Sequence, residues 1–122
     1  MVDQRNERLA IIDGLRTPFS RAGGPAAGLS ADDLGALVAR ELMARSPIAA
    51  KDLDEVIVGN VAQPADAANV ARIIALKAGL PQDLIASTVH RNCASGMEAI
   101  SGAGLRIRAG EAKALLCIGT ES

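Results

Sequence analysis

The fold is decided by the stretch Arg91-Asn92-Cys93-Ala94-Ser95-Gly96-Met97, which follows the apolar run 85–89 and begins a helical pattern. Cys93 therefore falls where a strand turns into a helix. At a helix N-terminus, unpaired backbone N–H groups and the helix dipole favour a thiolate over a thiol, and the same N–H groups can stabilise an oxyanion. The stretch suggests acyl transfer through a thioester on Cys93.

Length and composition indicate a single α/β domain with closely packed layers. Of the 122 residues, 49% are hydrophobic, 12 are glycine, and Phe19 is the one aromatic residue. Small side chains of this kind allow helices and sheet to approach closely. The net charge is −1 and the basic residues are scattered, which argues against a nucleic-acid partner.

The N-terminus and the cysteines indicate the cellular compartment. Residues 1–8 are polar, and the apolar run after them is too short for a signal-peptide core or a membrane span. We therefore expect a cytoplasmic protein without a membrane span. Cys93 and Cys117 are far apart, with no C-x-x-C motif and a single histidine in the chain. This pattern predicts reduced thiols and neither a metal site nor a redox dithiol.

Four short apolar runs predict strands covered on both faces of a sheet. They are residues 9–12, 56–58, 85–89 and 114–118. With helices between them, the β-α-β-α-β-α-β order predicts an α/β fold with a mostly parallel sheet. Residues 20–28 contain Gly23-Gly24-Pro25 and are expected to form a loop. Nothing marks a second domain.

The first predicted helix begins at Ser30, where Asp33 completes a capping-box pattern, and ends at residues 45–47. Its expected apolar face carries Leu34, Leu37, Val38 and Leu42.

The second predicted helix runs from about Asp66 to Gly79, with Pro81 just beyond, and the third runs from near Cys93 to Gly110. Three glycines lie inside the third helix, at positions 96, 102 and 104. Each costs about 1 kcal/mol relative to alanine, so we expect this helix to be buried centrally, where larger side chains would not fit.

Seven motifs occur in an order and at spacings that leave little room for coincidence. They are Ile12-x-x-Leu15-Arg16-Thr17-Pro18-Phe19, Asp33-Leu34, Val58-Gly59-Asn60-Val61, Asn69-Val70-Ala71-Arg72, Ala75-Leu76-Lys77-Ala78-Gly79-Leu80-Pro81, Thr88 through Cys93 to Ile100, and Gly119-Thr120-Glu121-Ser122. Together they resemble the N-terminal domain of the thiolase family over nearly the whole chain, so residues 1–122 would be that domain, with the helix that starts at the cysteine buried inside it.

The resemblance implies an acyltransferase that acts on coenzyme A thioesters. Cys93 would take the acyl group of a 3-oxoacyl-CoA, release acetyl-CoA, and pass the shortened acyl chain to a second CoA. Biosynthetic members run the reverse Claisen condensation. The backbone N–H of Cys93 would contribute to an oxyanion hole. CoA would be a substrate rather than a tightly bound cofactor, and the motifs do not identify the residues that bind it.

The resemblance also implies an assembly. Thiolases are typically homodimers or homotetramers. The segment Ala68-Asn69-Val70-Ala71-Arg72 looks more like the degradative thiolases of fatty-acid β-oxidation, some of which belong to multienzyme complexes. We therefore expect a homo-oligomer, with a β-oxidation partner as a further expectation.

The other catalytic groups that the resemblance requires do not occur in these 122 residues. They are a histidine in a G-H-P motif, a second cysteine in a C-x-G-G-G motif, and an Asn- or His-bearing motif for a second oxyanion hole; none of the three is present. The loop region that grips CoA and the C-terminal domain are also missing. We expect residues 1–122 alone to have little or no activity.

Cys117 and His90 have structural interpretations. Cys117 lies in the last apolar run and is expected to be a buried thiol rather than a second catalytic cysteine. His90 is three residues before Cys93, but we expect a hydrogen-bonded packing residue rather than the base that activates the thiol.

Four polar or small residues near the helix starts have similar interpretations. Ser95 and Gly96 are expected to shape the turn. Arg72 and Arg91 are expected to be solvated or paired, with contact to a CoA phosphate as the alternative.

Two other classes of function remain open. A condensing enzyme of the ketoacyl-synthase type also uses a cysteine at a helix start, but it has a histidine pair and decarboxylates its donor. The R-T-P-F, A-L-K-A-G-L-P and G-T-E-S motifs argue against it. The other class is a non-catalytic, short thiolase-like subunit or assembly module, which a native stop after Ser122 would support.

Overall fold

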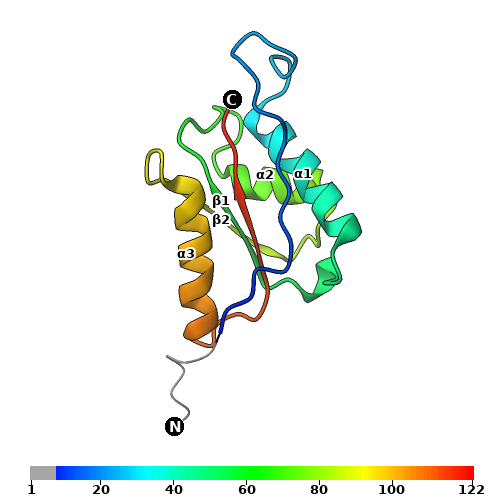
Figure 1. The fold of residues 1–122 in the computed structure, drawn as a ribbon, viewed down its shortest axis with the longest axis vertical. Helices are drawn as coiled ribbons and strands as arrows, with labels where there is room; N and C mark the ends of the chain where they lie inside the picture. Colours follow the sequence, from blue (N-terminus) through cyan, green and yellow to red (C-terminus); the bar gives the residue numbers. More distant parts are fainter. Residues whose placement is uncertain (1–7) are drawn as a thin grey trace.

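The computed structural model describes residues 8–122 and shows a sheet of three parallel strands between two layers of helices (Figure 1). The strand order is β2-β1-β3. The strands are β1 (Glu55–Gly59), β2 (Ile85–Val89) and β3 (Leu115–Gly119). Gly59 is in register with both Val89 and Gly119. The C-terminal ends of all three strands therefore lie side by side, at the C-terminal edge of the sheet.

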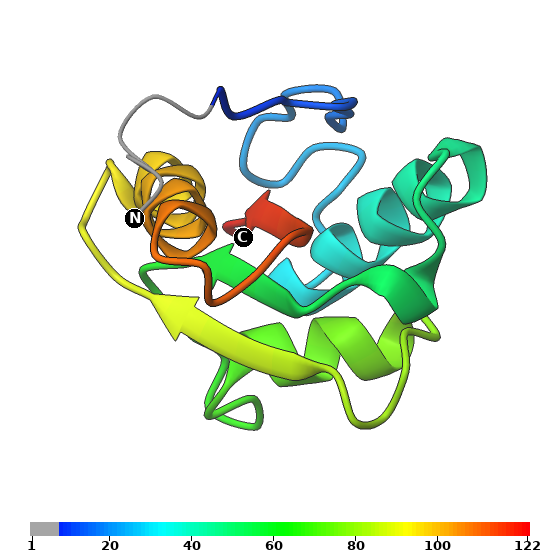
Figure 2. The same ribbon diagram turned by 90° about the horizontal axis from the view of Figure 1, so that it is seen from below.

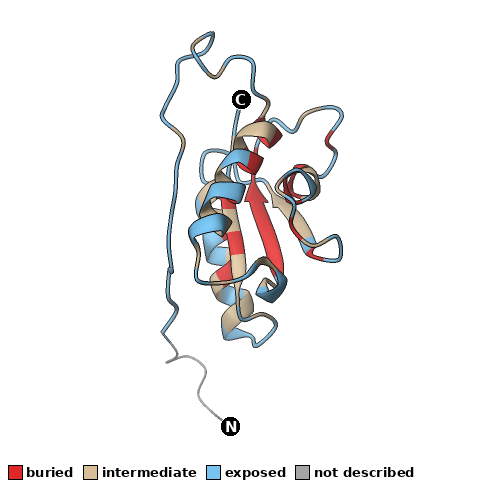
Figure 3. Cartoon of the chain, turned by 90° about the vertical axis from the view of Figure 1, so that its right-hand side faces the viewer, coloured by how far each residue is buried: buried red, intermediate tan, exposed pale blue. Residues whose placement is uncertain are grey.

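The helices are α1 (Ala31–Arg45), α2 (Val70–Lys77) and α3 (Ser95–Arg108), with a short 3-10 helix, η2 (Ala50–Asp52), before β1. Helices α1 and α2 cover one face of the sheet, and α3 covers the other (Figure 2). Strand β1 is buried over its whole length (Figure 3). Its Val56 and Val58 pack toward α1 and α2, whereas Ile57 packs against Ala99 and Ala103 of α3. This alternation explains why β1 is apolar at every position except its first and last residues.

The predicted strand at residues 9–12 is wrong. No strand forms before β1 in residues 8–122, and the N-terminal segment runs along the outside of the molecule (Figures 1 and 3). Ile11 is 83% exposed and Ile12 is 54% exposed. The run has strand-like residues but no backbone partner, and a strand forms only when its N–H and C=O groups can pair with a neighbour. The outer edge of β3 consequently stays unpaired among the described residues.

Helix α1 has the predicted ends, and its predicted apolar face is confirmed in part: Leu42 packs against the core and Leu34 and Val38 are partly buried, whereas Leu37 is 49% exposed. The Ser30–Asp33 capping box forms, and the helix ends at Arg45. Two small residues of the helix, Gly35 and Ala39, are buried as well. A Cβ on Gly35 would lie 2.5 Å from Ile74 Cδ1, so the two helices approach through a position that has no side chain.

Helix α2 begins later than predicted, at Val70 rather than near Asp66. Asn69 caps it by accepting the Arg72 N–H, and Ala67 belongs to a turn that closes on Pro64. The predicted stop is confirmed, because Gly79 has φ +75° immediately after the helix. Gly110, also with φ +75°, ends α3 in the same way.

Helix α3 is buried only on the side that faces the sheet, so the expected central burial is wrong for its outer side. Ser95, Ala99 and Ala103 are buried, whereas Met97 and Leu105 are 64% and 67% exposed. The interior glycines also differ from the expectation. A Cβ on Gly102 would meet only the end of the Arg106 side chain, 3.3 Å away, and one on Gly104 would meet Leu9 Cδ1 at 3.0 Å.

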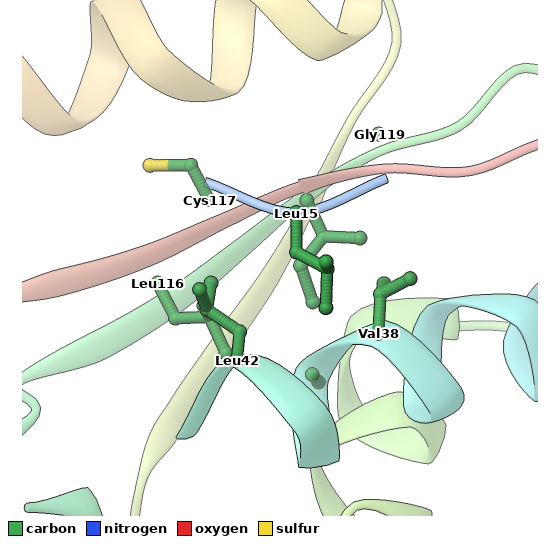
Figure 4. Close-up of a pocket in the computed structure, with 8 residues that line it drawn as sticks. Leu15, Val38, Leu42, Leu116, Cys117 and Gly119 are labelled. Carbon is green, nitrogen blue, oxygen red and sulfur yellow. The ribbon is translucent and has the colours of Figure 1, made fainter. Parts of the chain in front are cut away.

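A cavity of about 80 Å³ lies between α1, β3 and the N-terminal segment (Figure 4). Leu15 from the N-terminal segment faces Val38 and Leu42 of α1 across it. The thiol of Cys117 points away from these side chains (Figure 4). The helices of residues 8–122 include none that is long and apolar enough to cross a membrane.

Candidate active site

Cys93 lies in the turn that joins β2 to α3, at the edge where the three strands end. Its side chain is exposed. In open parallel sheets, this edge is where ligands bind, because loops and helix N-termini converge there. The structure therefore places the sequence-predicted cysteine where a reagent in solution can reach it.

The turn before α3 holds Asn92 in an unusual conformation. Asn92 has φ +50° and is the one non-glycine residue with positive φ among residues 8–122. Its carbonyl oxygen accepts hydrogen bonds from Ser95 Oγ at 2.7 Å and from the Ser95 N–H at 3.1 Å. Ser95 Oγ also accepts the Arg91 N–H at 2.8 Å. Ser95 thus shapes the turn, as predicted, through a buried hydroxyl.

The N-terminus of α3 has no side-chain cap. The residue at its N-cap position is Ala94, whereas α1 and α2 are capped by Ser30 and Asn69. The backbone N–H of Cys93 donates to no acceptor in residues 8–122. Unpaired N–H groups beside an exposed thiol are what an oxyanion hole requires.

Glycines set the position of this helix end on the sheet. A Cβ on Gly59, the last residue of β1, would lie 2.2 Å from the Ser95 carbonyl oxygen. A Cβ on Gly119, the last residue of β3, would lie 3.2 Å from the Gly96 Cα. The first turn of α3 therefore rests directly on the backbone of β1 and β3. Side chains at these positions would push away the turn that carries Cys93.

A second cluster of hydrogen bonds at the same edge was not predicted from the sequence. The carboxylate of Glu121 accepts the N–H groups of Val61 and Ala62, at 2.9 and 3.0 Å, and the Nδ2 group of Asn60 at 3.4 Å. Asn60 Nδ2 also donates to the Thr120 carbonyl at 2.8 Å. The partners are about sixty positions apart in the sequence, so only the motif residues themselves, V-G-N-V and G-T-E-S, could have drawn attention to them.

One polar atom of this cluster has no partner. Asn60 is 1% exposed, and its Oδ1 accepts no hydrogen bond from residues 8–122. A buried acceptor without a donor is costly, so Asn60 Oδ1 lowers the stability of the fold formed by residues 8–122.

Cys117 has the predicted structural role. Its Sγ donates to the carbonyl of Ala99 at 3.5 Å. Burial, and to a smaller extent the negative charge of Glu55, raise the pKa of the Cys117 thiol. The buried Glu55 is in turn held by Arg106 of α3 at 2.9 Å and by Ser87 of β2 at 2.6 Å. A thiol in this setting stays protonated and unreactive.

His90 is hydrogen-bonded, as predicted, but it is not a packing residue. Its side chain is exposed, and its Nδ1 accepts the N–H of Asn92 at 3.2 Å. Within residues 8–122 this imidazole forms no hydrogen bond with the Cys93 thiol.

Both arginines considered for a CoA phosphate are paired within the described chain. Arg91 contacts Glu98 of α3 at 2.6 Å, and this contact raises the pKa of the guanidinium. Arg72 donates to the carbonyl oxygens of Leu84, at 2.9 Å, and Gln82. These pairings favour the structural interpretation of both side chains.

The fold and the site define a class: a parallel α/β domain that presents an exposed cysteine before an uncapped helix. A family model described as the thiolase N-terminal domain matches residues 9–122. The chain belongs to the thiolase family, of which it carries the N-terminal domain.

The individual proteins that the chain resembles are also thiolases. The chain is 45% identical, over 92% of its length, to a β-ketoadipyl-CoA thiolase of Escherichia coli, and 38% identical over its whole length to a 3-ketoacyl-CoA thiolase of Escherichia coli strain 55989. It covers 28% of each of these proteins. The crystal structure of the Acat5 thiolase from Ascaris suum in complex with coenzyme A superposes with a TM-score of 0.84 at 32% identity, over 88% of this chain and 28% of that one.

Proposed function

We propose that the protein carrying this domain transfers acyl groups to and from coenzyme A through a thioester on Cys93. The favoured reaction is thiolysis of a 3-oxoacyl-CoA. The Cys93 sulfur attacks the C3 carbonyl, the C2–C3 bond breaks, and its electron pair leaves with acetyl-CoA, which takes up a proton. A second CoA thiol then displaces the acyl group from Cys93 and regenerates the free thiol. The reverse sequence is the Claisen condensation.

The observation that carries this proposal is the exposed Cys93 beside an unpaired backbone N–H at an uncapped helix start. Exchange of one thioester for another is nearly neutral in energy, so the enzyme needs chiefly to lower the barriers on either side of the acyl-cysteine. Donors already in place for the oxyanion lower such barriers without reorganisation. The names of the similar proteins, β-ketoadipyl-CoA thiolase and 3-ketoacyl-CoA thiolase, support a 3-oxoacyl-CoA as the substrate.

Residues 1–122 are proposed to supply the nucleophile but not the whole catalytic site. His90, the only histidine, uses Nδ1 for the Asn92 N–H, and Cys117 is held against Ala99. Neither side chain forms a hydrogen bond with the Cys93 thiol within residues 8–122. A general base and a second acid are required from outside these residues, so the 122 residues alone are proposed to have little or no turnover.

The proposed setting is a cytoplasmic homo-oligomer that degrades fatty acyl chains. The 3-ketoacyl-CoA thiolase similarity supports degradation. The exposed apolar side of α3, with Met97, Ile100 and Leu105, supports further protein contacts on this helix.

The experiment that tests the proposal is detection of the acyl-enzyme. The polypeptide as its source makes it is mixed with acetyl-CoA, quenched in acid and cleaved with trypsin, which releases residues 92–106 with Cys93 and separates them from Cys117. We expect an acetyl mass on residues 92–106, its absence in Cys93→Ala, and its persistence in Cys117→Ala. An acetyl group that survives Cys93→Ala would reject this assignment.

A further inference from the structure

We infer that His90 is a positioning residue for Cys93: its imidazole Nδ1 accepts the Asn92 N–H and holds the left-handed turn that presents the thiol. The inference rests on the proposed nucleophilic role of Cys93. His90 touches no reacting atom, so its effect must pass through the conformation of Asn92.

The turn needs such support. A residue with a Cβ is less favourable than glycine at φ +50°, and although asparagine tolerates this region better than most residues, the contacts around Asn92 decide how firmly it is held there. Asn92 immediately precedes Cys93, so a change in its backbone angles would redirect both the thiol and the unpaired Cys93 N–H. The geometry of the nucleophile therefore depends on how firmly Asn92 is held.

Asn92 is held at both of its backbone polar groups. Its carbonyl is bound by the hydroxyl and the N–H of Ser95, a buried residue, at 2.7 and 3.1 Å. Its N–H has one acceptor among residues 8–122, which is His90 Nδ1 at 3.2 Å. The carbonyl side is fixed by the start of the helix, whereas the N–H side depends on one exposed side chain.

The spacing of this hydrogen bond is that of an Asx-turn, in which a side-chain acceptor binds the backbone N–H two residues later. Asparagine forms the same ring with its Oδ1, so His90→Asn keeps the acceptor and removes the imidazole. His90→Ala removes the acceptor. Because the His90 side chain is exposed, neither substitution opens a cavity in the core.

The test uses these two variants in the polypeptide as its source makes it. The first measurement is hydrogen exchange of the Asn92 amide, and the second is the rate at which acetyl-CoA acetylates Cys93. We expect His90→Ala to speed exchange and slow acetylation, each by about threefold to tenfold, the change expected for one hydrogen bond. His90→Asn is expected to restore both.

Two results would overturn the inference: unchanged Asn92 exchange in His90→Ala, or an acetylation defect that His90→Asn fails to correct. A defect that follows loss of the imidazole rather than loss of the acceptor would point to a different role for His90. Wild-type protein that forms no thioester would reject the proposed function instead. In that case, exchange at Asn92, together with the rate of iodoacetamide alkylation of Cys93 relative to Cys117, still decides whether His90 sets the turn.

Discussion

Gly59 and Ser95 are in direct backbone contact: a Cβ on Gly59 would lie 2.2 Å from the Ser95 carbonyl oxygen. Ser95 is the first residue of α3, so this contact determines how closely the helix that follows Cys93 approaches the end of β1. We expect Gly59→Ala to lower the free energy of unfolding by more than about 2 kcal/mol, because backbone cannot move aside as a flexible side chain can. Urea unfolding measures the change. Gly28→Ala is the control, since a Cβ there meets nothing within 4 Å; equal losses in the two variants would contradict the prediction.

The left-handed conformation of Asn92 predicts an order of stabilities at this position. The described contacts of Asn92 use its backbone N–H and C=O, so substitutions test the backbone alone. Asn92→Gly should be neutral or slightly stabilising. Asn92→Ala should cost about 1 kcal/mol, and Asn92→Val should cost more because its branched Cβ is more crowded at φ +50°. Thermal unfolding of the three variants measures the order, and an Ala variant as stable as the Gly variant would show that the turn relaxes.

The ion pairs between α1 and α2 predict a dependence of stability on pH. Lys77 Nζ lies 2.5 Å from Asp32 and 2.8 Å from Asp33, and its hydrogen bond is the main cause that lowers the pKa of Asp33 from 3.8 to about 2. The pKa of Asp32 is lowered for the same reason. A carboxyl group whose pKa is lower in the folded state stabilises the fold above its unfolded pKa, and this contribution is lost as pH falls toward the folded pKa. Stability should therefore fall between about pH 4 and about pH 2.

Lys77→Met should make this fall shallower, because the two carboxyl groups then titrate nearer to their ordinary values. Urea unfolding of both proteins at several pH values measures the slopes. Lys51→Met removes an exposed lysine that forms no ion pair within residues 8–122 and should leave the slope unchanged. A Lys77→Met slope identical to that of the wild type would mean that other carboxyl groups control the acid transition.

The carboxylate of Glu121 predicts local protection of the loop after β1. It accepts the N–H groups of Val61 and Ala62. Glu121→Ala should speed hydrogen exchange of these two amides by about tenfold, as expected for hydrogen bonds to a charged acceptor. Glu121→Gln keeps one acceptor oxygen, so its exchange rates at these two amides should lie between those of the wild type and those of Glu121→Ala. The Ala67 amide donates to Pro64 instead and should exchange at the same rate in all three proteins.

The outer side of α3 predicts self-association of residues 1–122 when they are produced alone. Met97, Ile100 and Leu105 of this helix are 64%, 45% and 67% exposed, and large apolar side chains exposed on one helix favour protein contacts. Sedimentation velocity should show oligomers that Leu105→Glu weakens. Leu37→Glu, at a half-exposed position of α1, should weaken them less. A dilution-stable monomer of the wild-type chain would contradict the prediction.

The sequence predicts those parts of the structure that local chemistry determines. The Ser30–Asp33 box and the glycines after α2 and α3 fix helix ends through contacts within a few residues, and the buried run of β1 reflects cover on both faces. The strand predicted at residues 9–12 does not form. A strand needs a neighbouring strand to pair with, and the local sequence does not show whether it will pair with one. On α1, Leu37 is exposed although the pattern places it on the apolar face, and the close contact with Ile74 is made instead at Gly35, where hydrophobicity predicts nothing.

The candidate site likewise contains residues that the sequence could identify and contacts that it could not. Cys93 and Ser95 could be identified from their motif, and an asparagine before the cysteine is itself a signal, since Asn adopts positive φ more readily than most residues. Helix α2 starts late because Asn69, rather than Asp66, caps it; both residue types are good N-caps, so the sequence alone does not choose between them. The contacts of Glu121 with residues 60–62 could not be predicted, because sixty residues of chain separate partners that the parallel register brings together.

The unpaired outer edge of β3 has a consequence for handling the protein. Any polypeptide in which β3 remains an edge strand presents a row of free backbone donors and acceptors, and its sequence LLCIG carries no charge or proline to block them. Such an edge can recruit strands from other molecules during folding at high concentration. Inclusion bodies would then reflect misdirected strand pairing rather than an unstable core, and a strand that covers this edge would reduce them.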